Sequence, residues 1–256
     1  MKGSWRRIGA LAAGLALLPA CAGILGEPLP SPPPRVAVLA LADSSASRSD
    51  GEGFSPLSDS SAAPLVATLR FRATHQRDST LDRAYADLRK QANRLGANAY
   101  RLRGTCPASN LCEVEVGVYD APDDEPAADP LPADAVVVFG PLLEGAKHAT
   151  FKLNGEERSL APLHYLVYTN TGDEMTLSRG GFLTGASLTL KGNDGDPPSY
   201  WSTTGVSVGP ALSAGRAPGV GITLNSGRIQ SVDVGLGRFL VAVLHESDGD
   251  PSGGNG

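Results

Sequence analysis

The sequence has only three cysteines in 256 residues, and it has no long apolar stretch beyond its first 20 residues. A helix that spans a bilayer needs about 20 consecutive apolar residues, so we expect no membrane-spanning segment after Cys21. The complete motifs of zinc proteases, phosphate-binding loops and dinucleotide-binding folds are also missing. The sequence therefore predicts no metal and no cofactor.

An excess of basic charge is missing as well. The chain carries 22 Lys and Arg residues against 27 Asp and Glu residues, a formal net charge of -5. Nucleic-acid-binding domains usually present a basic surface. We therefore expect no nucleic-acid partner.

The N-terminus does carry a clear pattern. Lys2, Arg6 and Arg7 precede an apolar run over residues 8–18. A basic start followed by a short apolar run is typical of a secretory signal peptide, and the run is too short to span a bilayer. We assign residues 1–20 to a signal peptide and expect the protein to be exported.

The signal peptide ends in Leu18-Pro19-Ala20-Cys21, which resembles the lipobox, the processing site of bacterial lipoproteins. The resemblance implies cleavage before Cys21, with lipid added to its sulfur and to its new amino group. Ala22 follows instead of Asp, and the sorting rule of enteric bacteria then implies the outer membrane, facing the periplasm. The alternative is an ordinary secreted protein with a chance cysteine near its cleavage site.

Cys106 and Cys112 remain once Cys21 is lipidated. An even number of cysteines in an exported protein favours a disulfide. A metal-binding pair is the alternative, but structural zinc sites use closer cysteine spacings and four ligands. The sequence predicts a disulfide between Cys106 and Cys112.

Residues 35–119 are predicted to form a small α+β domain. The prolines within residues 22–34 indicate a semi-rigid tether over residues 21–34. Residues 36–41 are typical of a short buried strand, whereas the polar tract 43–63 predicts a mobile loop or a longer tether. Alternation over residues 65–74 predicts a strand with one buried face. Helical spacing follows, from an N-cap at Ser79 to a stop at Gly96.

Two more alternating strands follow the helix and complete a ββαββ unit. If the two later cysteines lie opposite each other in a hairpin, opposite charges meet each other and apolar residues meet each other. The predicted pairs are Arg103 with Glu115, Leu102 with Val116, and Tyr100 with Val118.

Four arginines are expected on the solvent face of this sheet: Arg70, Arg72, Arg101 and Arg103. Only Glu113 and Glu115 balance them there. One interpretation is an ordinary salt-bridged face. The other is a docking surface for phosphate or carboxylate groups, such as lipid headgroups or an acidic partner.

Leu88, Ala92 and the run Leu95-Gly96-Ala97-Asn98-Ala99 precede a cysteine-bearing hairpin. In a lipoprotein, this pattern resembles the RcsF family of envelope-stress-sensing outer-membrane lipoproteins and the related YbjQ-like small domains. The resemblance covers residues 64–119 and implies a similar local fold and a signalling role. The sequence departs from that family by offering one disulfide instead of two and by adding a large C-terminal region.

The C-terminal half is predicted to be all-β. Residues 120–134 hold four prolines and six acidic residues, which favours an interdomain linker. Short strands without a helical period then predict an antiparallel sandwich or barrel over residues 135–246, with a disordered tail at 247–256. The predicted strands are residues 135–139, 149–153, 163–169, 175–177, 187–190, 220–224, 228–234 and 238–244.

One motif suggests catalysis. Gly205-Val206-Ser207-Val208-Gly209 fits the nucleophile-elbow pattern, with Asp233 and His245 following in hydrolase order. That elbow needs a helix directly after the serine turn, but Pro210 follows at once and the next segment is too short. We therefore interpret this stretch as a loop or strand.

The other polar motifs favour structural roles. His75, His148 and His164 fit surface or packing positions, and Asp194 and Asp196 fit a solvated turn instead of a calcium site. The sequence as a whole predicts a non-enzymatic, membrane-anchored envelope lipoprotein that acts as a binding, scaffold or stress-sensing module through an envelope protein partner. The alternative is an envelope serine hydrolase that uses Ser207, Asp233 and His245.

Overall fold

The structure is a computed structural model. It describes residues 36–42, 53–73, 80–104, 112–124, 127, 129, 131–142, 146–169, 172, 174–180, 185–191, 195–204 and 229–247. These residues form a mostly β fold with two helices and three sheets, none of which closes into a barrel. The predicted signal peptide, Cys21, the predicted tether and residues 248–256 lie outside the described residues.

The first sheet has five strands in the order β1-β3-β5-β4-β2. They are β1 (Val36–Leu41), β2 (Ser55–Pro56), β3 (Leu65–Ala73), β4 (Ala99–Arg103) and β5 (Cys112–Tyr119). The register of β4 and β5 pairs Tyr100 with Val118, Leu102 with Val116 and Arg103 with Glu115. The register predicted from the sequence is therefore confirmed.

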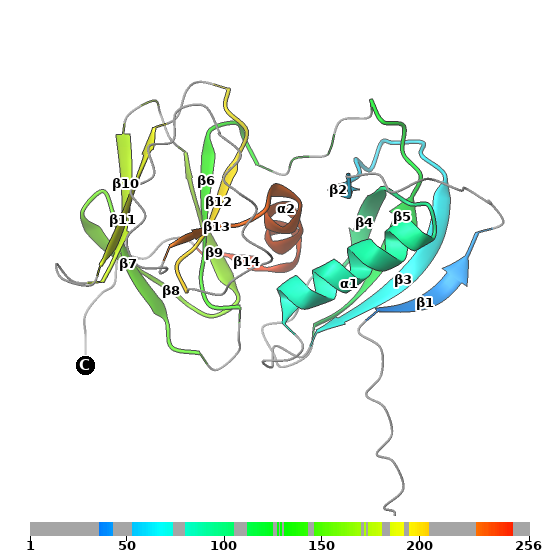
Figure 1. The fold of residues 1–256 in the computed structure, drawn as a ribbon, viewed down its shortest axis with the longest axis horizontal. Coiled ribbons are helices and arrows are strands. Elements are labelled where there is room, and N and C mark those ends of the chain that lie inside the picture. Colours follow the sequence, from blue (N-terminus) through cyan, green and yellow to red (C-terminus); the bar gives the residue numbers. More distant parts are fainter. Residues whose placement is uncertain are drawn as a thin grey trace, which may run out of the picture. The chain divides into compact units, whose positions relative to one another are not determined.

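Helix α1 (Leu81–Arg94) covers one face of this sheet, as Figure 1 shows. Its apolar residues recur every three or four positions and form one buried face, which includes Leu81, Tyr85 and Leu88. Thr80 is the N-cap, so the helix begins one residue later than predicted. The Thr80 side chain makes no capping hydrogen bond.

The polar tract before β3 is more ordered than predicted. Phe54 and Leu57 are buried, and β2 pairs with β4 in parallel. Leu57 joins Ala99, Tyr119 and Ala121 in a small apolar cluster. The predicted mobile loop over residues 43–63 thus contains a short strand and two buried apolar side chains within residues 53–63, and residues 43–52 lie outside the described residues.

Two further sheets follow residue 134. One has the order β11-β10-β7-β8 and the other the order β13-β12-β6-β9-β14. Their strands are β6 (Ala135–Phe139), β7 (Ala149–Leu153), β8 (Glu156–Leu160), β9 (His164–Thr169), β10 (Glu174–Arg179), β11 (Ala186–Lys191), β12 (Ser199–Ser202), β13 (Gln230–Ser231) and β14 (His245–Glu246).

One hydrophobic cluster joins these two sheets. Val136, Val138 and Trp201 from one sheet pack with Phe151 and Leu177 from the other. The prediction of wholly antiparallel strands was wrong, because β12 pairs with β6 in parallel and β14 pairs with β9 in parallel.

The all-β prediction was wrong as well, because residues predicted as the last strand form helix α2 (Val234–Val243). Asp233 is its N-cap, and the Asp233 carboxylate accepts hydrogen bonds from the backbone N–H groups of Gly235 and Leu236. This cap satisfies backbone donors that the first helical turn leaves unpaired.

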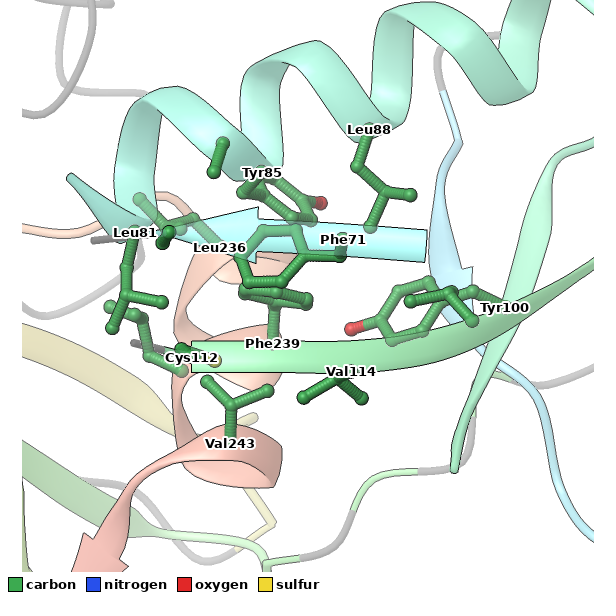
Figure 2. Close-up of a cluster of buried hydrophobic side chains, with 14 of the residues drawn as sticks. Phe71, Leu81, Tyr85, Leu88, Tyr100, Cys112, Val114, Leu236, Phe239 and Val243 are labelled. Atoms are coloured by element: carbon green, nitrogen blue, oxygen red, sulfur yellow. The ribbon is translucent and has the colours of Figure 1, made fainter. Parts of the chain in front are cut away.

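Helix α2 completes the core of the first sheet. Phe239 lies in the middle of the apolar side chains in Figure 2, with ring centroids 5.2 Å from Phe71 and 4.9 Å from Tyr85. The helix approaches its neighbours so closely that a Cβ atom at Gly237 would lie 2.3 Å from Cγ of Tyr200. Glycine is therefore required at this contact.

Candidate functional site

Several residues that the sequence marks for attachment or chemistry lie outside the described residues. This is true of Cys21, Cys106 and Ser207. Cys112 is buried at the start of β5 and is disulfide-bonded. Its pairing with Cys106 stays a prediction.

The arginine face of the first sheet is centred on Glu113. The Glu113 carboxylate lies 3.2 Å from Nε of Arg70 and 2.6 Å from Nη2 of Arg72. A hydrogen bond from Arg72 lowers the pKa of Glu113, and the positive charges of Arg72 and Arg70 act in the same direction. Two of the four predicted arginines thus share one exposed carboxylate, which balances one of their two positive charges.

Arg101 serves the fold of the sheet. Its guanidinium donates to the carbonyl oxygens of Ser58 and Ser61, the latter at 2.7 Å, and lies 4.8 Å from the ring centroid of Tyr119. Arg103 is exposed and makes no ion pair within the described part of the chain. The docking role of this face stays a prediction. Arg103 is the arginine whose charge would be available to a phosphate or carboxylate group.

The structure does not bring Asp233 and His245 together. Asp233 caps the N-terminus of α2, and His245 follows the other end of the same ten-residue helix. At about 1.5 Å per residue the helix separates them by about 15 Å. Asp233 therefore cannot orient His245 as a hydrolase triad requires.

A buried polar cluster lies around α2, and sequence reasoning missed it. Nη2 of Arg238 lies 2.7 Å from Oδ2 of Asp129, and both side chains are about four-fifths buried. The Tyr200 hydroxyl lies beside Arg238. Oδ1 of Asp129 and the hydroxyl group of Tyr100 are buried and have no hydrogen-bond partner among the described residues. Ordered water is the usual partner for such groups.

Burial dominates the chemistry of this cluster. It raises the pKa of Tyr200 to about 12, and the neighbouring Asp129 carboxylate adds to that rise. Burial also raises the pKa of Tyr85 and of Tyr100. All three phenols are neutral at physiological pH and offer no nucleophile, so the cluster fits a structural role.

Two histidines meet on the five-stranded sheet that contains β9 and β14. His164 and His245 are direct partners in these adjacent parallel strands, and their ring centroids are 5.6 Å apart. Nδ1 of His164 lies 2.8 Å from the carbonyl oxygen of Pro162. Nε2 of His245 is buried and has no hydrogen-bond partner in the part of the chain that the structure describes.

Two of the remaining sequence candidates, Asp196 and His148, take part in local hydrogen bonds. The Asp134 carboxylate accepts hydrogen bonds from the backbone N–H groups of Gly195 and Asp196, which closes a turn. His148 lies beside the Ser159 hydroxyl on the other sheet, and His75 and Asp194 lie outside the described residues. Among the described residues, no group of three or more His, Cys, Asp or Glu side chains could hold a metal, and no helix is long and apolar enough to cross a membrane.

The edges of the three sheets differ in how they are protected. Strands β2, β13 and β14 have two residues each. Strand β8 is charged, and β11 exposes Ser187, Thr189 and Lys191. Strand β1 has six apolar residues, of which Val38, Leu39 and Leu41 are 42%, 41% and 65% exposed. Proteins usually shorten, charge or cover an edge strand, so β1 is the unprotected edge among the described sheets.

Known proteins give no further guidance, since no family model, no curated protein and no solved structure matches this chain.

Proposed function

We propose that this protein is a lipoprotein of the bacterial envelope, anchored through Cys21, that binds a protein partner by pairing β1 with an extended apolar segment of that partner. It acts as a binding or scaffold module without catalysis. The outer membrane, facing the periplasm, is the proposed location. The exposed, uncharged edge of β1 is the observation that carries the proposal.

Strand β1 has the two features that recognition by strand addition needs, which are a backbone edge that can form hydrogen bonds and exposed side chains that can contact the added strand. Among the described residues its backbone pairs with β3 on one side only, so its other side can bond to an incoming strand. Its exposed side chains are Val, Leu and Ala and carry no charge, so the partner segment must also be apolar. The pairing with β3 shifts between Val38 and Ala40; this bulge shortens the straight edge and favours a reversible contact.

The place of β1 in the chain supports the same function. Residues 22–35 separate Cys21 from β1, and this length of chain reaches at most about 50 Å. A lipid at Cys21 would therefore keep β1 near the membrane surface, where an envelope partner is available. The proposal has two further parts. The two C-terminal sheets form a β-sandwich, and the protein has the stress-sensing role that the RcsF resemblance implies.

Site-specific photo-crosslinking in the intact lipoprotein tests the proposal. A crosslinker at Leu41 should capture a partner in the native membrane, whereas one at Thr189 on the polar edge strand β11 should not. Val38→Lys should abolish capture because a lysine blocks an edge, and Thr189→Lys is the matched control. Equal capture from both positions, or capture that survives Val38→Lys, would contradict strand addition. The Cys21→Ser variant should lose membrane attachment.

A further inference from the structure

We propose that His164 and His245 form a binding site for a divalent transition metal of the kind that imidazole prefers, such as Zn²⁺. The two rings are the protein ligands, and solvent completes the coordination. This inference is independent of the proposed binding at β1.

The spacing of the rings fits a shared metal ion. Their centroids are 5.6 Å apart and their planes are tilted by 43°. Zinc binds imidazole nitrogen at about 2.0–2.1 Å, so two rings on one tetrahedral ion have centroids about 5–6 Å apart. The parallel pairing of β14 with β9 sets this spacing, since the two residues are direct partners.

The hydrogen bonds leave the right atoms available. The carbonyl oxygen of Pro162 can only accept, so Nδ1 of His164 carries the proton and donates to it. Nε2 of His164 then keeps its lone pair for a metal, and a backbone carbonyl behind the ring is a usual support of a ligating histidine. Nε2 of His245 has no hydrogen-bond partner in the described structure. A metal ion would provide the partner that this buried nitrogen lacks.

Backbone strain beside the pair supports a functional constraint. Leu163 is buried and has a φ of 63°, in the left-handed region that Leu rarely adopts. Its N–H donates to the carbonyl of Pro141, and its carbonyl accepts from the N–H of His245. The fold thus holds an unfavourable conformation at the residue that precedes His164, and such strain is concentrated at functional sites.

Zinc titration of the full-length, lipid-modified protein in detergent tests the site. After treatment with a chelator, calorimetry with zinc chloride should show one ion bound per chain. His164→Gln and His245→Gln should each lower the affinity at least about tenfold, the smallest loss that even indirect support residues usually cause. His148→Gln is the matched control and should bind zinc like the unmodified sequence.

A second measurement does not depend on how the variants fold. In the protein with the native sequence and ¹⁵N-labelled histidine, zinc should shift the side-chain signals of His164 and His245 and leave those of His148 in place. Because a metal binds neutral imidazole, mild acidification should reverse the shift. The absence of any zinc-dependent shift, or shifts confined to other histidines, would overturn the proposal, as would variants that bind zinc with unchanged affinity.

Discussion

The buried tyrosines around α2 show how the fold controls single side chains. Tyr85, Tyr100 and Tyr200 are each at most 5% exposed, and burial raises the pKa of all three. The neutral phenol is therefore favoured in the folded protein. In the unfolded chain the same groups ionise near pH 10.

We expect stability to fall as the pH rises above about 10. The unfolded chain then loses phenol protons that the folded protein retains, so the free energy of unfolding decreases by at most roughly 1.4 kcal/mol per pH unit for each tyrosine. For Tyr200 this loss ends near pH 12, where the folded protein ionises as well. Urea midpoints measured across this range check the slope, and Tyr200→Phe should reduce it. A flat profile with free ionisation of all tyrosines would contradict the buried cluster.

The sequence revealed single residues only where a local pattern marked them. Alternation along β4 and β5, with the two later cysteines taken to lie opposite each other, placed Arg103 opposite Glu115. Alternation along β3 placed Arg70 and Arg72 on the charged face. The Asp129–Arg238 ion pair had no such signal, because its partners are 109 positions apart. The pairing of His164 with His245 was missed for the same reason, since it depends on a parallel strand contact between distant segments.

Sequence reasoning predicted a strand over residues 238–244, most of which lie in helix α2. Its core Phe-Leu-Val-Ala-Val is short, apolar and rich in β-branched residues, and such a run does not distinguish a strand from a buried helix. Gly235 and Gly237 also lower helix propensity. The missed signal was Asp233, a favourable N-cap directly before Val234, the first residue of the helix.

Asp233→Ala should destabilise the protein by about 1 kcal/mol, because it removes the acceptor for the N–H groups of Gly235 and Leu236. Asp233→Asn keeps an oxygen at that position and should retain most of the stability. Thermal and urea midpoints of the two variants measure the difference. A hydrolase that depends on Asp233 would instead lose activity in both variants. Equal stability of Asp233→Ala and the unmodified protein would contradict the capping role.

Across the described protein, the largest hydrophobic cluster includes residues from both sides of the predicted linker. Leu69 and Leu88 come from the N-terminal sheet and its helix, whereas Phe139, Tyr200 and Phe239 follow residue 134. The sequence separated these regions because residues 120–134 are acidic and rich in proline. Composition shows where a chain is polar, but it does not show which distant apolar faces pack together.

We therefore expect the two sides of this cluster to unfold together. Phe239→Ala removes a side chain with no exposed surface and should cost about 3–5 kcal/mol. Native-state hydrogen exchange should show equal losses of protection in β3 and in β6, because both strands contribute to the cluster that Phe239 joins.

Val234→Ala, at a position of α2 that is 45% exposed, should change stability by less than about 0.5 kcal/mol. A loss confined to β3 would mean that the N-terminal sheet unfolds separately, and that α2 contributes its contacts without coupling the two regions.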